Sequence, residues 1–568
     1  MPAALPAPGN PFGTAHCLHF FCKTMYMKWR LLYLLVPACL AACTNNTSQQ
    51  ADNKKNTDQP APPPATARVV PRNTGIDSSN SYSNLFLDST ALEQFIARQK
   101  PGDATAAALR NFYNGRNFQY AWFAADGFTE QALAFRALYD YTKDSTTNRK
   151  LLDNELDELM TKDSLPIEEP DASIVKTELL LSWRFINYLG NTYKNSDKFD
   201  AALQQLVPSR RKPVLQMAED LLAGKDDITL FDNAGYARLK EQLRQWLPLA
   251  KSGNRAALPA GSKKYKKGSR ASFIKKLKKR LQWGGMAASA DTSAVFDDAT
   301  EQAVKAFQSS LGLTPNGIVT PALVRELNRS AASRLQQLVV NMERMRWQPH
   351  ENEGRHILVN IPEFILHAWE GKTKAFDMPI VVGKEGHGTV LFAGSLDQIV
   401  FSPYWNVPES IVRREILPEM QKNRHYLSEN EMEITGERNG LPVVRQLPGD
   451  KNELGKIKFL FPNSFNIYFH DTPHKWLFSR DKRAYSHGCI RLEDARKMAA
   501  WLLSNMPGWS PERIDSAMNA GKEKTVKPEN PVPVLINYYT AWVDENNLLQ
   551  FRQDIYRHDE KLAAKLFE

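Results

Sequence analysis

From about residue 81 to residue 260, apolar residues recur every three or four positions, which is the spacing of helices that bury one face. Leu92 and Phe95 show this spacing near the start of the segment, and Leu239 and Leu243 show it near the end. The pattern predicts a helical scaffold domain over 81–260. No motif within this domain indicates a chemical activity.

A second, shorter helical pattern covers residues 271–330. It contains Ala-Val-Lys-Ala-Phe-Gln at 303–308 and Leu-Gly-Leu-Thr-Pro-Asn-Gly-Ile-Val-Thr at 311–320. Thr320 and Pro321 are a typical N-cap and first residue of a last short helix. These stretches resemble the small three-helix peptidoglycan-binding domain. The resemblance implies a module that binds glycan or braces a neighbouring domain.

From residue 356 the pattern changes to short β-prone runs separated by Pro, Gly and Lys turns, which predicts a mainly-β domain over 356–505. Within it, the polar and charged stretch 410–455 reads as helix and loop and predicts an inserted lid, and a helix is expected at 492–503. Residues 506–568 are expected to form a C-terminal helical segment that packs on the scaffold. The fold class is therefore α+β and multidomain.

Residues 1–43 have the pattern of an export signal. Lys-Trp-Arg precedes an apolar run at 31–40, and Ala-Ala-Cys43 follows, as in secretory signal peptides. The run is shorter than the roughly 20 residues that span a bilayer. Leu-Ala-Ala-Cys43 resembles the lipobox of bacterial lipoproteins, which implies a lipid anchor on Cys43; a cleaved signal with an incidental cysteine is the alternative. We expect the true start to be Met25 or Met27.

The segment 44–80 is rich in Asn, Gln, Ser, Thr, Pro and Ala. Such a composition buries too little apolar surface to offset the loss of chain entropy on folding. The sequence therefore predicts a disordered tether between the signal region and the folded chain. A tethered body is expected in the cell envelope, held at a membrane by the lipid.

Composition and charge limit the possible classes of protein. The 568 residues carry 73 Lys and Arg against 63 Asp and Glu, a net charge of +10 with 24% charged residues, which excludes wholesale disorder. The basic run within 263–280 is read as a solvated face, and nucleic acid is not an expected partner of an exported chain. Four of the five cysteines precede residue 44, so Cys489 is the only thiol of the body. This excludes a disulfide scaffold and a zinc ribbon there.

The residues with recognisable chemistry are His-Asp-Thr-Pro-His at 470–474 and Ser-His-Gly-Cys-Ile-Arg at 486–491. We expect Cys489 to precede a helix, whose N-terminus, together with nearby cations, would lower the pKa of the thiol. A histidine within reach would accept its proton, and a third group would fix the histidine tautomer. Gly488 would let successive N–H groups converge, as an oxyanion hole requires.

Two other interpretations of these residues stay open. Cys489 could be an inert buried thiol, because free cysteine is among the most buried residue types. His470 and His474, with His487 nearby, could bind zinc. Pro473 would break the helix that usually presents such a pair, however, and no acidic base follows it.

The two motifs are similar to the catalytic motif of the L,D-transpeptidases (the YkuD-type fold), in which a histidine lies upstream of Ser/Thr-His-Gly-Cys by about the nineteen positions seen here. The order of domains resembles the large YcbB-type subclass. The resemblance implies that Cys489 is the nucleophile and His470 its base. The backbone carbonyl of Asp471 would hold the tautomer of His470, and the N–H groups of His487, Gly488 and Cys489 would stabilise the oxyanion.

The resemblance also implies substrate contacts and a reaction. Arg491 would order the turn or meet a substrate carboxylate, Ser486 would contribute to substrate binding, and Tyr404 and Trp405 would line the cleft. The thiolate would attack the third residue of a peptidoglycan stem tetrapeptide and release D-Ala. The amine of a neighbouring stem would then form a 3→3 cross-link. No metal or organic cofactor is needed, and carbapenem-type β-lactams would acylate Cys489.

Two rival functions are not separated by the sequence. If water rather than an amine accepts the acyl group, the protein is an L,D-carboxypeptidase, and the balance depends on how the lid excludes water. A non-catalytic lipoprotein that anchors the membrane to peptidoglycan would also fit the lipobox and the 271–330 module. The intact pair of His470 and Cys489 argues against this second rival.

Overall fold

The structure is a computed structural model. It describes residues 68–141, 167–253, 256–259, 261, 263–283, 293–348, 354–463 and 465–568. The signal region, with Cys43, Met25 and Met27, lies outside the described residues, as does 44–67 of the expected tether. Within the described ranges, none of the helices is both long and apolar enough to cross a bilayer.

Residues 68–80, which we expected to belong to the disordered tether, are instead packed on the scaffold. The side chain of Ile76 is fully buried, and the N–H of Val70 donates to the Asn111 side chain at 2.7 Å. The prediction of disorder is therefore wrong for this part. Its composition is polar, but hydrogen bonds to a neighbouring helix hold its backbone.

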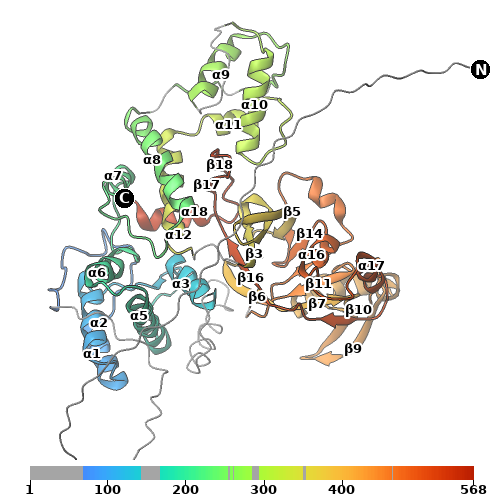
Figure 1. Ribbon diagram of the computed structural model, residues 1–568, viewed down its shortest axis with the longest axis horizontal. Coiled ribbons are helices and arrows are strands. Elements are labelled where there is room, and N and C mark those ends of the chain that lie inside the picture. The colour runs from blue at the N-terminus through green and yellow to red at the C-terminus, as the bar shows by residue number, and fades with distance from the viewer. Residues whose placement is uncertain are drawn as a thin grey trace, which may run out of the picture. The chain divides into compact units, whose positions relative to one another are not determined.

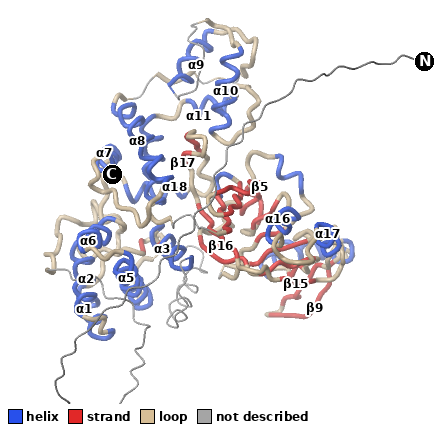
Figure 2. Tube along the Cα trace, viewed as in Figure 1, coloured by secondary structure: helices blue, strands red, loops and turns tan. Residues whose placement is uncertain are grey.

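The helical scaffold is confirmed (Figures 1 and 2). Its described helices are α1 (Ser89–Gln99), α2 (Asp103–Gly115), α3 (Glu130–Tyr141), α5 (Ala172–Thr192), α6 (Ser196–Gln205), α7 (Val214–Leu222) and α8 (Ala234–Lys251). A short hairpin, β1 (Phe123–Ala124) and β2 (Gly127–Phe128), precedes α3. Asp88, Asn195 and Asn233 cap helix N-termini through their side chains. A later helix, α12 (Ala331–Met345), packs against α8.

The three-helix unit is also present, as α9 (Ser272–Trp283), α10 (Asp298–Ser310) and α11 (Pro321–Leu327). Thr320 caps α11 by accepting a hydrogen bond from the N–H of Leu323 at 3.2 Å, and Pro321 opens the helix. Both roles follow the sequence prediction. The apolar faces of the three helices form one buried cluster.

A curled sheet forms the centre of the C-terminal half, and its strands are drawn in red in Figure 2. The strands are β3 (Arg355–Asn360), β4 (Ile365–Glu370), β5 (Thr373–Gly383), β6 (Phe392–Leu396), β7 (Gln398–Phe401), β11 (Ile457–Leu460), β12 (Phe469–His470), β13 (Ala484–Ser486), β14 (Ile490–Leu492), β15 (Lys524–Val526) and β16 (Val532–Asn537). Their order is β15-β7-β11-β12-β14-β5-β4-β3-β16-β6, and β13 pairs with β5. Helices α16 (Ala495–Leu502) and α17 (Pro511–Met518) contribute to the same apolar core.

The inserted segment contains a hairpin that we did not predict. After α13 (Glu409–Ile411), the π-helical turn η2 (Val412–Ile416), α14 (Leu417–Lys422) and α15 (Tyr426–Glu429), the chain forms β9 (Met432–Arg438) and β10 (Leu441–Gln446). β10 also pairs with β8 (Trp405–Asn406). Asn439 and Gly440 have φ of 54° and 72°, as a two-residue hairpin turn needs. β9 is mostly exposed and carries three charged residues, so it shows no clear apolar alternation, and β10 is partly buried but begins Leu-Pro.

The C-terminal segment 506–568 is not helical throughout, which corrects the prediction. Besides α17 it contains β15, β16, β17 (Ala541–Val543) and β18 (Leu549–Phe551) before α18 (His558–Leu566). β16 pairs with both β3 and β6, so the sheet extends beyond residue 505. Prolines such as Pro533 hid this strand, since proline is rare inside sheets. α18 shares a buried cluster with α7 and α8 of the scaffold.

Candidate active site

Three strands hold the two motifs together. β13 and β14 both pair with β5, in parallel and antiparallel directions respectively, so the connection 487–489 between them is a tight reversal. On its other side β14 pairs in parallel with β12, which ends at His470. The sheet therefore brings the predicted nucleophile and the predicted base onto neighbouring strands.

Cys489 and His470 lie on the same face of the sheet. His470 is opposite Arg491, and Phe469 is opposite Ile490. Phe469 and Ile490 point into the buried core, and successive side chains of a strand alternate between faces. Cys489, Arg491 and His470 therefore share the other face, where Cys489 is only half-buried.

The structure does not place Cys489 at a helix N-terminus, contrary to our expectation. The strand β14 follows it, and α16 starts only at Ala495, capped by Asp494. Burial raises the pKa of the Cys489 thiol above its ordinary value, although hydrogen bonds from Tyr468 and the charge of Arg491 oppose the rise. The thiol is therefore protonated at neutral pH, and a base must remove its proton when it attacks.

His470 has the hydrogen bonding that the predicted base needs. Its Nδ1–H donates to the backbone carbonyl of Asp471 at 2.6 Å, which leaves Nε2 as the acceptor. Burial, with a smaller contribution from the charge of Arg491, lowers the pKa of His470 to about 3. The imidazole is therefore neutral at physiological pH and can accept a proton. The tautomer-fixing contact is the one that the family resemblance implies for Asp471.

The thiol and the imidazole are not yet hydrogen-bonded to each other. Among the described residues, the Sγ–H of Cys489 donates to the backbone carbonyl of Asn466 at 3.6 Å. Catalytic hydrogen bonds are often long or misaligned before substrate binds. A change of the Cys489 side-chain rotamer would redirect the thiol within the face that it shares with His470.

Ser486 and Gly488 shape the reversal that carries Cys489, the predicted nucleophile. The Ser486 hydroxyl donates to the backbone carbonyl of Cys489 and accepts from the N–H of Gly488 at 3.2 Å. Gly488 has a φ of +119°, which side chains disfavour. In the described part of the chain, the N–H groups of His487 and Cys489 make no hydrogen bond. Of the three expected oxyanion donors, these two are free, and the N–H of Gly488 is already used.

Charged residues surround Cys489 and His470. The Arg491 guanidinium lies 3.6 Å from Glu453, which also pairs with His474 at 3.0 Å. The Nε of Arg491 is buried and has no hydrogen-bond partner within the described residues. The Asp471 carboxylate pairs with Lys475 at 2.6 Å. Arg491 thus retains an unused donor beside the nucleophile.

The inserted segment 410–455 directly contacts the connection 487–489, which carries Cys489 and is called the nucleophile loop below. Glu415 of η2 lies 3.1 Å from Nε2 of the exposed His487. Tyr404 and Trp405, which we expected to line the cleft, lie at the base of this segment. The Arg445 guanidinium covers the Tyr404 ring at 4.2 Å, and Trp405 packs on the apolar core of the insertion. Neither side chain has a contact with Cys489 or His470 among those that the structure describes.

Sequence comparison assigns three parts of the chain. Residues 354–534 match the family model of the L,D-transpeptidase catalytic domain. The chain carries an L,D-transpeptidase catalytic domain. Residues 107–243 match the model "Scaffold domain", and residues 270–327 match "Putative peptidoglycan binding domain". The match to the L,D-transpeptidase domain ends within β16, in agreement with the pairing of that strand.

A curated relative supports the assignment of the L,D-transpeptidase domain. A protein of Haemophilus influenzae named "Putative L,D-transpeptidase" is 31% identical over 243 residues, which are 40% of this chain and 49% of the relative. The match thus spans about half the length of that relative.

Solved structures of L,D-transpeptidases also match. The enzyme from Mycobacterium smegmatis has 14% identity and a TM-score of 0.19, over 32% of this chain and 58% of that one. The enzyme from Stackebrandtia nassauensis has 13% identity and a TM-score of 0.19, over 50% and 97%. The assignment itself rests on the family models and the curated relative.

Two residues near the nucleophile were not found by sequence reasoning. Tyr468 lies opposite Cys489, because the N–H of Ile490 donates to its carbonyl at 3.1 Å. Thr389 reaches the nucleophile loop from between β5 and β6 and donates to the carbonyl of Gly488 at 2.8 Å. Tyr468 lies two positions before the first motif, so its strand position was a usable signal. Thr389 lies a hundred positions before the second motif and had none.

Proposed function

We propose that the protein is an L,D-transpeptidase that forms 3→3 peptidoglycan cross-links through a thioester on Cys489. The observation that carries the proposal is a neutral, tautomer-fixed imidazole on the same sheet face as a half-buried thiol. The match of residues 354–534 to the L,D-transpeptidase catalytic domain supplies the substrate class. The peptidoglycan-binding match supports action on the cell wall.

The first step acylates the enzyme. Nε2 of His470 takes the proton from Cys489 as the sulfur attacks the carbonyl of the third stem residue. The N–H groups of His487 and Cys489 receive the negative charge that develops on the carbonyl oxygen. His470 then gives its proton to the amine of the departing D-Ala, and a thioester remains on Cys489.

The second step transfers the acyl group. The side-chain amine of a diamino acid on a neighbouring stem attacks the thioester, and His470 takes a proton from this amine. The sulfur leaves as the thiolate and takes that proton back from His470, and an amide joins the two stems. A β-lactam of the carbapenem type presents a strained amide to the same sulfur, so we propose that it acylates Cys489 covalently. We propose an envelope location, with a lipid anchor at Cys43.

We also propose how the domains of the chain work together. We propose that the scaffold domain, the peptidoglycan-binding module and the catalytic domain act as separate units of one chain. In this arrangement, the segment 410–455 acts as a lid that admits an amine and excludes water. The contact between Glu415 and His487 supports this role, because it links the insertion to the loop that carries the nucleophile.

Product analysis with purified protein tests the proposed function. The protein is incubated with a disaccharide-tetrapeptide, and the products are separated and weighed by mass spectrometry. We expect cross-linked dimers with a 3→3 bond and free D-Ala. Tripeptides without dimers would instead show an L,D-carboxypeptidase, and unchanged tetrapeptide would support the non-catalytic anchoring role.

The pH dependence of acylation tests the protonation states. Because the pKa of His470 is lowered to about 3, the base stays neutral as pH falls from 7 to about 4. Because the pKa of Cys489 is raised, no thiolate accumulates near neutral pH. We therefore expect kcat/KM to be nearly constant from pH 5 to 8, with an acid limb only below about pH 4. A limb at pH 6 to 7, or a rate that rises tenfold per pH unit, would contradict this.

A further inference from the structure

A buried hydroxyl outside both motifs contacts the nucleophile loop. Thr389, which is 2% exposed, lies between β5 and β6. Its Oγ1 donates to the backbone carbonyl of Gly488 at 2.8 Å and accepts from the N–H of Gly383 at 3.1 Å. One side chain thus ties the end of β5 to the residue that precedes Cys489.

This contact orients a peptide group that the reaction uses. The carbonyl of Gly488 and the N–H of Cys489 belong to one planar trans peptide, so they point in opposite directions. With the carbonyl held by Thr389, the N–H of Cys489 is directed away from Thr389. That N–H has no hydrogen-bond partner in the described ranges. Gly488 has a φ of +119°, which favours glycine, and a glycine has no side chain that could hold this peptide.

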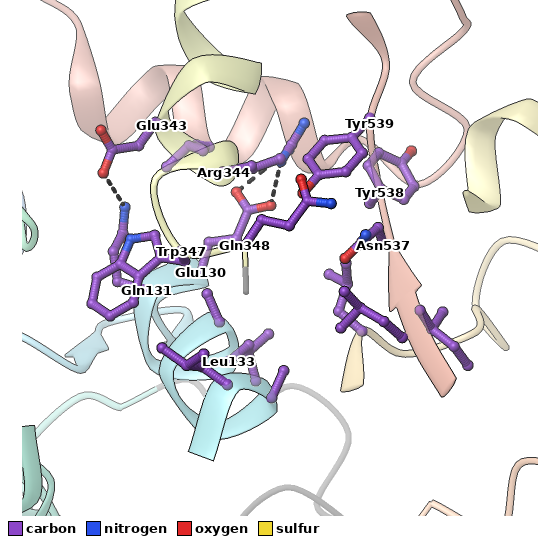
Figure 3. Close-up of a pocket in the computed structure, with 17 residues that line it drawn as sticks. Glu130, Gln131, Leu133, Glu343, Arg344, Trp347, Gln348, Asn537, Tyr538 and Tyr539 are labelled. Atoms are coloured by element: carbon purple, nitrogen blue, oxygen red, sulfur yellow. Dashed lines mark hydrogen bonds and ion pairs between the residues drawn. The ribbon is translucent and has the colours of Figure 1, made fainter. Parts of the chain in front are cut away.

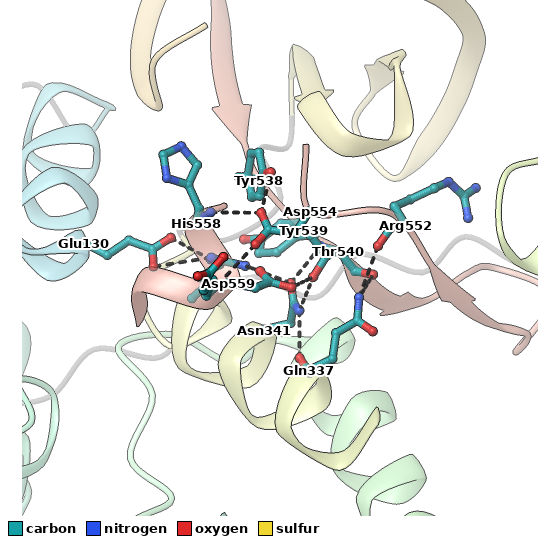
Figure 4. Close-up of polar contacts among 12 residues, drawn as sticks. Glu130, Gln337, Asn341, Tyr538, Tyr539, Thr540, Arg552, Asp554, His558 and Asp559 are labelled. Carbon is teal, nitrogen blue, oxygen red and sulfur yellow. Dashed lines mark hydrogen bonds and ion pairs between the residues drawn. The ribbon is translucent and has the colours of Figure 1, made fainter. Parts of the chain in front are cut away.

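Tyr556 braces Thr389 from a distant part of the sequence. Its hydroxyl donates to the carbonyl of Gly383 and accepts from the N–H of Thr389 at 3.3 Å. The N–H of Tyr556 in turn donates to the Tyr538 hydroxyl at 2.8 Å. That hydroxyl donates to the Asp554 carboxylate at 2.7 Å (Figure 4). Tyr556 lies beyond the end of the match to the L,D-transpeptidase catalytic domain.

We propose that Thr389 is a positioning residue that aims the N–H of Cys489 at the developing oxyanion, and that Tyr556 supports it from the C-terminal segment. The inference rests on the proposed function, because it needs Cys489 to be acylated. Thr389 takes no proton and forms no bond with substrate. Its effect is confined to steps in which negative charge develops on a carbonyl oxygen.

Two reagents separate this role from a general effect on the thiol. A carbapenem acylates the sulfur through a tetrahedral oxyanion, whereas iodoacetamide alkylates it by displacement of iodide, with no oxyanion. Thr389→Val keeps the shape of the side chain and removes the hydroxyl. We expect it to lower the acylation rate and kcat about 10²-fold, as a misplaced catalytic group does, and to change the alkylation rate less than about twofold. Thr389→Ser should restore acylation.

Matched variants complete the design. Thr129 of the scaffold makes the same two kinds of bond, to the carbonyl of Ala121 at 3.1 Å and from the N–H of Ala132 at 3.3 Å. Thr129→Val should therefore leave both rates unchanged. Tyr556→Phe keeps Thr389 and loses only the brace, so it should slow acylation selectively even if Thr389→Val does not fold.

The outcomes distinguish this inference from the proposed function. Equal losses in acylation and alkylation, or normal acylation in Thr389→Val and Tyr556→Phe, would overturn the positioning role alone. Wild-type protein that is alkylated at Cys489 but never acylated would overturn the proposed function, and the positioning role with it.

Discussion

Replacing Cys489 by alanine is expected to abolish cross-linking and D-Ala release, with a loss in kcat on the order of 10⁴-fold or more. The alanine side chain cannot form the thioester, and the oxyanion donors alone provide little rate. Because Cys489 is half-buried at the end of a reversal, the protein should keep its fold, which circular dichroism can check. The rate is measured as dimer formation from tetrapeptide stems.

Variants of His470, alone and combined with Cys489→Ala, test whether the two residues act together. His470→Ala alone is expected to lose nearly as much activity, since the protonated thiol then has no base. Residues that act as one unit are not additive, so the double variant should be no slower than Cys489→Ala. An additive loss, or residual cross-linking in Cys489→Ala, would contradict the role of these two residues.

Replacing Arg344 by methionine is expected to destabilise the protein by about 3–5 kcal/mol, the usual cost of breaking a buried ion pair. Arg344 of α12 contacts Glu130 of α3 at 2.6 Å (Figure 3) and also Asp559 of α18, so one guanidinium joins three segments. Figure 4 shows Glu130 and Asp559 together. A cavity of about 60 Å³, lined by Leu133 and Tyr539 among others, lies beside it. Without Arg344, two carboxylates stay in a buried place with no cation.

Urea unfolding measures this loss, and an exposed pair provides the control. Arg110 contacts Glu93 at 2.7 Å, but the two side chains are 35% and 54% exposed. Arg110→Met should therefore cost less than about 1 kcal/mol. Burial already raises the pKa of Glu130, and Arg344 opposes that rise. In Arg344→Met the pKa of Glu130 should rise further, so Glu130 becomes neutral as pH falls toward 5. The loss in the free energy of unfolding should therefore become smaller at that pH. If Arg344→Met lost no more free energy of unfolding than Arg110→Met, the stabilising role of the buried Arg344 ion pairs would be contradicted.

The sequence was sufficient to find the motif residues because their types and their spacing resemble a known catalytic motif. Phe469 and Ile490 alternate with His470 and Cys489, and this alternation places the pair on one face. The helices of the scaffold and of the three-helix unit follow from apolar spacing and from caps such as Thr320. These features depend on residues that are close together in the sequence, so the sequence alone predicts them.

The remaining features depend on contacts between distant residues. Ile490-Arg491-Leu492 fits either a helix start or a strand, and only pairing with β5 and β12 makes it a strand. The expected low pKa of Cys489 is wrong because burial raises it, and because β14 rather than a helix N-terminus follows the residue. The hairpin around Asn439 and the strand around Pro533 gave weak patterns, because β9 is mostly exposed and β16 contains a proline.

Capture of the acyl-enzyme tests the central claim most directly. The protein is mixed with a tetrapeptide stem without an acceptor, quenched in acid within seconds, digested, and mapped by mass spectrometry. We predict a tripeptidyl adduct on the peptide that contains Cys489, with the mass of the donor minus D-Ala and with lability to hydroxylamine, as a thioester requires. An adduct on any other residue, or turnover with no adduct at any quench time, would contradict the account.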